Sequence, residues 1–171
     1  MGEFLNQLTK AMTWLGEQPD TIFIGQSVLY PGTRMSETLE GVPREKRVEM
    51  PVAEDMQLGI SIGLSLEGFF PVSIYPRWNF LLCAANQLVN HLDRIEEYSE
   101  YRPRVIVRTA VWGNNPLDPG PQHCDDCSQA FADTLRRVPV VKLTDGCNPL
   151  KEYQEWFDEQ RSVLIVEDMR C

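Results

Sequence analysis

The chain lacks the features that direct a protein to nucleic acid or to a membrane. Its 171 residues hold 16 lysines and arginines against 25 aspartates and glutamates, so the formal net charge is −9 and no basic cluster stands out. Nucleic acid and anionic membranes are therefore poor partners. Its uncharged apolar runs are shorter than the roughly 18 residues that a spanning helix needs, and the N-terminus lacks the layout of a signal peptide. We expect a cytoplasmic protein.

The cysteines do not form the pattern of a disulfide scaffold. Five cysteines, an odd number without a secretory signal, indicate reduced thiols. Cys83 lies in an apolar run and is interpreted as a small core residue. His123, Cys124 and Cys127 form an H-C-x-x-C group with the residue types of a zinc site, but no second pair at zinc spacing follows. A small zinc protein is thus the less favoured hypothesis.

No internal repeat, low-complexity tract or linker divides the chain, so we expect one domain that spans residues 1–171. Short β-branched runs alternate with segments of helical periodicity. The predicted strands are 21–25, 48–50, 71–75, 104–109, 139–143 and 162–167, and the predicted helices are 2–15, 53–68, 81–95, 128–138 and 149–160. This alternation predicts an α/β fold, a three-layer sandwich with a mostly parallel sheet of about six strands and helices on both faces.

In the segment 53–68 the apolar residues are spaced as in a strand, but the segment has the length of a helix. Apolar residues alternate with glycine and serine as far as Leu66, which favours a strand. However, the run is long for a strand, begins with two acids and ends at Gly68, as helices often do. We therefore predict a helix that is buried on several sides, with Gly59 and Gly63 letting another backbone come close.

Glu54 is the first candidate functional residue. It lies where the strand 48–50 is followed by the helix 53–68. In open α/β sheets, ligands bind at the carboxyl ends of strands, beside the helix starts that follow. An acid at a helix start can also serve the helix dipole alone. Its position therefore favours a functional role without requiring one.

Five stretches of the sequence, in order and with matching gaps, resemble one family. They are GEFLNQLTKAM, IFIGQSV, PVAEDMQLGISIGLSLEGFFPV, RWNFLLCAANQLVN and GPQHCDDCSQAFA. Together they resemble the pyrimidine-binding domain of thiamine diphosphate enzymes, specifically the N-terminal half of the beta subunits of 2-oxo acid dehydrogenases. The middle domain of transketolases is similar but less close. The resemblance covers nearly the whole chain.

The resemblance implies a cofactor that is shared with a partner. In such enzymes a second kind of domain holds the diphosphate and Mg²⁺ through a Gly-Asp-Gly motif and a later Asn. This chain offers only Asp145-Gly146, preceded by Thr144, and no Asn at the required distance. The resemblance thus implies that this chain binds the aminopyrimidine of thiamine diphosphate. A separate diphosphate-binding subunit would hold Mg²⁺, in a homodimer or heterotetramer.

The resemblance also assigns roles to individual residues. Glu54 matches the Glu that hydrogen-bonds the pyrimidine ring nitrogen, where a shared proton favours the imino tautomer and lets the exocyclic nitrogen take the thiazolium proton. Phe80 matches the aromatic residue that packs on the pyrimidine, and His123 matches a His on the substrate side. Gln26 and Ser27 stand where the family has acids after the first strand, and we place Gln26 among the cofactor-binding residues.

Two hypotheses from different classes remain open. The chain is either a subunit of a split enzyme, transketolase-like or 2-oxo acid decarboxylating, or a non-catalytic regulatory module that keeps the fold and the dimer surface. After His123 the family's Ser-Gln is replaced by Cys124-Asp125, and the family's further C-terminal domain does not follow. We therefore expect a stand-alone chain, with the helices 53–68 and 81–95 at its interface. The sequence does not distinguish a ketose phosphate from a 2-oxo acid as substrate.

Overall fold

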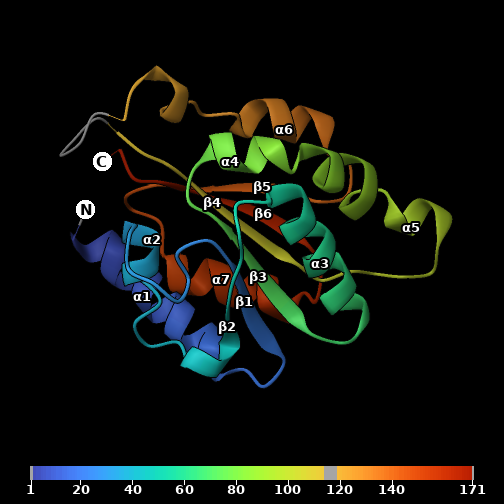
Figure 1. Ribbon diagram of the computed structural model, residues 1–171, viewed down its shortest axis with the longest axis horizontal. Coiled ribbons are helices and arrows are strands. Elements are labelled where there is room, and N and C mark those ends of the chain that lie inside the picture. The colour runs from blue at the N-terminus through green and yellow to red at the C-terminus, as the bar shows by residue number, and fades with distance from the viewer. Residues whose placement is uncertain (1, 114–118, 171) are drawn as a thin grey trace.

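The computed structural model describes residues 2–113 and 119–170, which form a six-stranded, all-parallel sheet (Figure 1). The strand order is β2-β1-β3-β4-β6-β5. The strands are β1 Thr21–Gly25, β2 Arg47–Glu49, β3 Phe70–Tyr75, β4 Ile106–Val111, β5 Val140–Leu143 and β6 Val163–Asp168. Because every strand runs the same way, all carboxyl ends lie at one edge of the sheet. The predicted α/β sandwich is confirmed.

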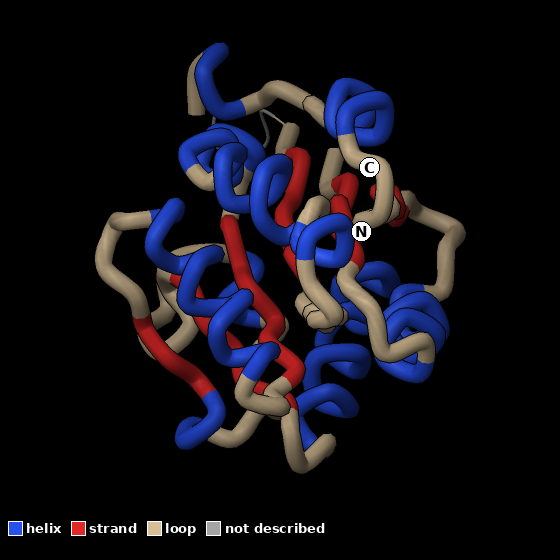
Figure 2. The backbone as a smooth tube through the Cα atoms, turned by 90° about the vertical axis from the view of Figure 1, so that its right-hand side faces the viewer, coloured by secondary structure: helices blue, strands red, loops and turns tan. Residues whose placement is uncertain are grey.

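Helices cover both faces of the sheet, as Figures 1 and 2 show from two directions. One face is covered by α1 Gly2–Glu17 and α7 Pro149–Asp158, and the other by α3 Glu54–Leu66, α4 Trp78–Cys83 and α6 Ser128–Thr134. The shorter segments are α2 Arg34–Glu37, α5 Ile95–Tyr98, a π-helical segment Gln87–Leu92, and 3₁₀ turns at Arg44–Lys46 and Pro121–His123. Of the described helices, none has the length and apolar character needed to cross a membrane.

The central strands are buried along their whole length because helices lie on both sides. Every residue of β3, β4 and β6 is buried, as expected for strands of a covered parallel sheet. Alternate residues serve opposite faces: Ile106 packs with α1 and α7, whereas Val107 packs with α3 and α4. Phe70 stacks on Phe157 of α7 with ring centroids 4.9 Å apart. The alternation thus divides the apolar core into two layers.

The segment 53–68 forms a helix, as its length and flanking residues predict, but one side of it is exposed. Met56 is 48% exposed and Ile60 is 39% exposed. A Cβ added at Gly63 would meet nothing within 4 Å, and one at Gly59 would meet only the Gln87 side chain, at 3.7 Å. The expectation that these glycines admit another backbone is therefore wrong within this chain.

The predicted helix 81–95 is interrupted. Its apolar face is buried as expected at Leu81, Ala84, Leu88, Leu92 and Ile95. The backbone passes from α4 through the π-helical segment to α5, and Cys83 is exposed rather than part of the core. Asp93 is fully buried, and its carboxylate accepts the backbone N–H groups of Arg136, Arg137 and Val138. These bonds hold the chain out of the helix, so α6 ends at Thr134 instead of 138.

An ion pair lies fully inside the core between the sheet and α7. Arg108 on β4 donates through Nε and Nη2 to the Glu167 carboxylate on β6, at 2.7 and 3.0 Å. The Tyr153 hydroxyl of α7 donates to the same carboxylate at 2.7 Å. Burial by itself would lower the pKa of Arg108, but the adjacent carboxylate outweighs it and raises the pKa. The Glu167 charge is thus matched by a cation that donates two hydrogen bonds, and by one further hydrogen bond from Tyr153.

Candidate functional site

The four predicted site residues come from loops and helix starts at the carboxyl edge of the sheet. Gln26 follows β1, Glu54 begins α3 after β2, and Phe80 lies on α4 after β3. His123 ends the 3₁₀ turn in the segment that follows β4, part of which, residues 114–118, lies outside the described residues. The structure pairs Gln26 with Glu54 and Phe80 with His123. In open parallel sheets this is the edge where ligands bind.

Glu54 is a buried carboxylate held by an amide. Only 7% of the residue is exposed, and Gln26 Nε2 donates to Glu54 Oε1 at 3.0 Å. Among residues 2–113 and 119–170, no lysine, arginine or histidine forms an ion pair with it. A buried carboxylate without a cation is unfavourable unless another group compensates it. Glu54 therefore has the environment of a residue that serves a ligand.

Gln57 and Tyr75 fix the first turn of α3 against the sheet. The fully buried Gln57 donates through Nε2 to the Ile74 carbonyl at 2.9 Å and to Ser73 Oγ at 3.2 Å. The Tyr75 hydroxyl donates to the Glu54 carbonyl at 3.4 Å, and burial raises the pKa of Tyr75. The start of α3, and with it Glu54, is therefore tied to β3.

The loop that carries Gln26 is held by a second carboxylate. Gly25 approaches β3 so closely that a Cβ there would lie 2.5 Å from the Ile74 carbonyl oxygen. Ser27 has a φ of 57°, in the left-handed region that non-glycine residues rarely adopt. The Glu49 carboxylate accepts the N–H groups of Ser27, Val28 and Leu29 at 2.7 to 2.9 Å. Glu49 thus holds the strained turn that presents Gln26 to Glu54.

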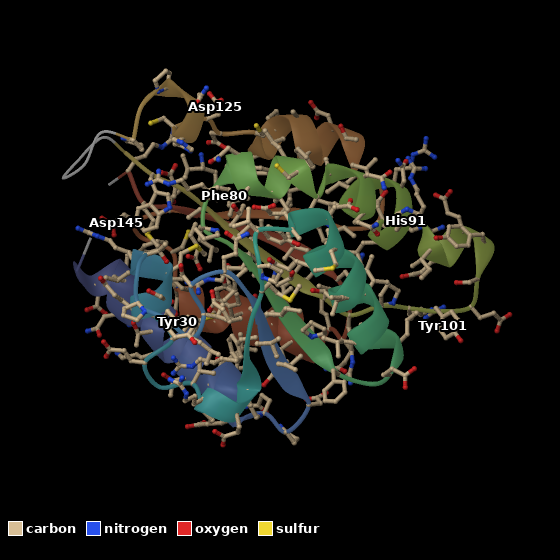
Figure 3. All side chains as sticks on the ribbon, viewed as in Figure 1. Tyr30, Phe80, His91, Tyr101, Asp125 and Asp145 are labelled. Carbon is tan, nitrogen blue, oxygen red and sulfur yellow. The ribbon has the colours of Figure 1, made fainter. Side chains whose placement is uncertain are left out.

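Phe80 and His123 form the other part of the site. Their ring centroids are 6.2 Å apart with an interplanar angle of 41°, and both residues are half-buried. Arg77 Nη1 donates to the His123 carbonyl at 3.2 Å. His123 Nδ1 is buried and has no hydrogen-bond partner within the described part of the chain. Figure 3 shows Phe80 and Asp125, two residues beyond His123, at the same end of the molecule.

A cluster of charges ties the segment after His123 to the ends of β5 and β6. Lys142 donates to Asp126 at 2.7 Å and lies 3.1 Å from the Asp168 carboxylate. Arg170 donates to Asp168 at 2.5 and 2.8 Å. The hydrogen bonds from Arg170 and then Lys142 hold the pKa of Asp168 well below its usual range. This cluster positions the loop that carries His123.

The cysteines near His123 do not form a metal centre in the described part of the chain. No three His, Cys, Asp or Glu side chains there are grouped to hold a metal ion. Cys83, Cys127 and Cys147 are free thiols. Burial, followed by the nearby Asp125 and Asp126 charges, raises the pKa of Cys127. A raised pKa keeps the thiol protonated and makes it a poorer thiolate ligand.

Apolar side chains are exposed next to the site, on α3 and α4. Met56 and Ile60, one helical turn apart on α3, are 48% and 39% exposed. Val52, just before α3, is 79% exposed, and Leu82 on α4 is 43% exposed. Met56 and Ile60, four residues apart, lie on the same side of α3. This face adjoins the helix start that carries Glu54.

Sequence analysis missed Glu49, Gln57 and Arg77. Each acts on a partner at least 17 residues away: Glu49 on the 27–29 turn, Gln57 on Ile74, and Arg77 on the His123 carbonyl. The available signal was weak in each case. Gln57 is a polar residue one turn after Glu54 in a helix rich in apolar residues, glycine and serine, and Glu49 ends a short strand two residues before a proline.

No protein-family model matches the chain, and no curated protein matches it. The chain is similar in fold to a split-gene transketolase solved as an inactive beta4 tetramer, with a TM-score of 0.71 and 20% identity, over 95% of this chain and 50% of that one. It is also similar to a 2-oxoglutarate:ferredoxin oxidoreductase from Magnetococcus marinus, solved with 2-oxoglutarate, coenzyme A and succinyl-CoA bound. That TM-score is 0.59 at 14% identity, over 96% of this chain and 28% of that one.

These comparisons establish the fold. The chain spans half the length of the transketolase chain and less than a third of the oxidoreductase chain. Both neighbours are consistent with the pyrimidine-binding-like domain that the sequence predicts.

Proposed function

We propose that this chain is one subunit of a split thiamine diphosphate-dependent enzyme, transketolase-like or acting on a 2-oxo acid. One observation carries the proposal: Glu54 is buried at the carboxyl edge of the sheet, oriented by Gln26, and has no cation partner among the described residues. The fold likeness to a transketolase and to a 2-oxoglutarate oxidoreductase supports this enzyme class.

The residues present fit an aminopyrimidine. Glu54 offers a carboxylate oxygen for a ring nitrogen, and its other oxygen is already engaged by Gln26. Phe80 offers a half-buried ring that can pack on a planar ligand. The buried Nδ1 of His123 lacks a partner in the part of the chain that the structure describes. A proton-sharing carboxylate, an aromatic surface and an imidazole thus gather at one edge.

Thiamine diphosphate, when bound, supplies a nucleophilic carbon and a sink for the electrons of a breaking carbon–carbon bond. Glu54 shares a proton with the pyrimidine nitrogen through the oxygen that Gln26 leaves free. The low exposure of Glu54 strengthens this bond, because few water molecules compete for it. Phe80 excludes water from the pyrimidine, and His123 donates a hydrogen bond to the substrate oxygen.

A separate subunit completes the site in this proposal. The chain has Thr144-Asp145-Gly146 where a diphosphate motif would need Gly-Asp-Gly. The partner therefore holds the diphosphate and Mg²⁺. The exposed apolar residues Met56 and Ile60 of α3 and Leu82 of α4 provide its docking face. We expect the complete enzyme to be a homodimer or a heterotetramer.

The second candidate is a non-catalytic module that associates with itself. The transketolase neighbour forms an inactive beta4 tetramer, and the exposed apolar face of α3 suits a second copy equally well. A homo-oligomer with no Gly-Asp-Gly partner would favour this candidate.

Calorimetric titration of thiamine diphosphate with Mg²⁺ distinguishes the two. We expect weak binding to this chain alone. Binding should become at least tenfold tighter, about 1.4 kcal/mol or more, when a co-purifying or adjacently encoded chain with Gly-Asp-Gly and a later Asn is added. Affinity that is unchanged by every such chain would count against the split enzyme.

A further inference from the structure

A cavity of about 420 Å³ lies at the end of the molecule opposite Glu54. Its lining comes from segments that precede β4, β5 and β6, namely Glu96, Arg102, Arg136, Arg137, Glu159, Gln160 and Arg161. These segments meet at the amino edge of the sheet because the strands are parallel. Figure 3 shows Tyr101, the neighbour of Arg102, far from Phe80 and Asp125. The cavity is therefore separate from the candidate site.

The lining is basic in an acidic protein. Four arginines and two glutamates line the cavity, although the whole chain has a net charge of −9. Arg137 lies 3.8 Å from both Glu96 and Glu97, and Arg161 lies 3.9 Å from Glu159, so these ion pairs are longer than hydrogen bonds. The guanidinium groups of Arg102 and Arg136 make no ion pair with any described residue. The positive charge that no ion pair compensates, within the described residues, is therefore that of Arg102 and Arg136.

Two buried polar side chains hold the arginine-bearing segments in place. Asp93, which is fully buried, accepts the backbone N–H groups of Arg136 and Arg137 at 2.8 to 3.1 Å. Ser162, which is 6% exposed, donates to the Pro103 carbonyl at 2.7 Å and thereby ties the segment after Arg102 to the start of β6. The backbone that presents the arginines is therefore preorganised, which lowers the entropic cost of binding a ligand.

We propose that this cavity binds a small anion that carries a chain of phosphate groups, such as a nucleoside triphosphate. Arginine is suited to phosphate because its planar guanidinium donates two parallel hydrogen bonds to phosphate oxygens. The cavity volume falls in the range of about 300–1,000 Å³ that is typical of small-molecule sites. An acidic protein segment would need a more extended surface, so the cavity favours a small molecule.

Titration calorimetry of the full chain with inorganic triphosphate and with ATP tests the proposal, at low and at physiological ionic strength. We expect both to bind, and binding should weaken as salt is added. If triphosphate and ATP bind with equal affinity, the cavity recognises the phosphate chain alone. If ATP binds more tightly, the nucleoside also contacts the cavity. The double variant Arg102→Gln/Arg136→Gln should bind at least about tenfold more weakly, because it loses charge-assisted hydrogen bonds.

The matched control is Lys10→Gln/Arg44→Gln, which removes the same charge from exposed positions outside the cavity. Its affinity should stay within about twofold of the wild type, since screening weakens distant charges. Equal weakening in both double variants would show non-specific attraction and overturn the proposal. Failure of both probes to bind would also overturn it, and binding of an oligoglutamate peptide instead would indicate an acidic protein partner.

Discussion

Two buried glutamates in this protein have opposite environments. Glu167 is fully buried in the core, where Arg108 and Tyr153 satisfy its carboxylate. Glu54 is 7% exposed at the carboxyl edge of the sheet, with one hydrogen bond to its carboxylate from Gln26 and no cation among the described residues. Within the described residues, the charge of Glu167 is matched by a cation, whereas the charge of Glu54 is not.

The difference separates a carboxylate whose charge is matched inside the fold from one that, under the proposed function, serves a ligand. A buried charge matched by a cation contributes to a unique fold, and removing its partner leaves the other charge uncompensated. A buried charge without a partner is a cost that the rest of the fold must offset. Gln57 and Tyr75 hold the start of α3 in place despite that cost, and Glu49 holds the turn that presents Gln26 to Glu54.

The largest effect on stability should come from Glu167→Gln. This variant leaves the Arg108 guanidinium buried without a matching charge, so we expect the free energy of unfolding to fall by about 3–5 kcal/mol. Urea denaturation measures the change. The double variant Arg108→Met/Glu167→Met should recover much of the loss, because no unpaired charge remains. A loss below about 1 kcal/mol in Glu167→Gln would remove the contrast between the two glutamates.

Glu49→Gln should have an intermediate effect. The amide keeps one acceptor oxygen for the 27–29 turn but replaces the other with an NH2 group and loses the charge, so we expect about 1–2 kcal/mol of destabilisation. Because this turn presents Gln26 to Glu54, cofactor affinity should also fall. Urea denaturation and calorimetry measure the two changes. If Glu49→Gln leaves the cofactor affinity unchanged, the 27–29 turn does not position the site.

Asp168→Asn should have an effect of similar size at pH 7, but one that depends on pH. Hydrogen bonds from Arg170 and Lys142 depress the pKa of Asp168, so its contribution is fully present above the unfolded value of about 4 and is lost as the pH falls through the depressed pKa. We expect a loss of about 1–2 kcal/mol at pH 7 that shrinks below about pH 4. Denaturation curves across this range measure it. A difference that stays constant down to the lowest pH would contradict the assigned ionisation.

The smallest effect on stability is expected for Glu54→Gln. Replacing a buried carboxylate that lacks a cation with a neutral amide should leave the free energy of unfolding unchanged or raise it by up to about 1 kcal/mol. The same urea titration measures it. A loss as large as that of Glu167→Gln would make Glu54 a structural residue.

Local patterns predicted much of this fold. The strand Thr21–Gly25 has the predicted bounds because β-branched and aromatic residues precede a glycine that must lie against β3. The segment 53–68 was assigned correctly because length and helix ends outweighed its alternation. The fold neighbours agree with the family resemblance drawn from five separated stretches.

Features that depend on distant partners were not predictable from local patterns. The burial of Asp93 has no local signal because its partners, the N–H groups at 136–138, lie more than 40 residues further along the chain. Cys83 and the glycines of α3 were assigned to the interior because apolar neighbours do not reveal which side of a helix is covered. The pairing of Gln26 with Glu54 joins residues 28 apart and emerges only when β1 and β2 lie side by side.

The most direct measurement is the turnover of the reconstituted enzyme, with this chain as wild type, Glu54→Gln or Asp55→Asn. Asp55 is an exposed acid next to Glu54, so its variant makes the same change of charge outside the site. We predict that Glu54→Gln lowers turnover at least about 100-fold, since the amide cannot share a proton with the pyrimidine, while Asp55→Asn stays near wild type. Wild-type turnover in a folded Glu54→Gln variant would contradict the assigned role.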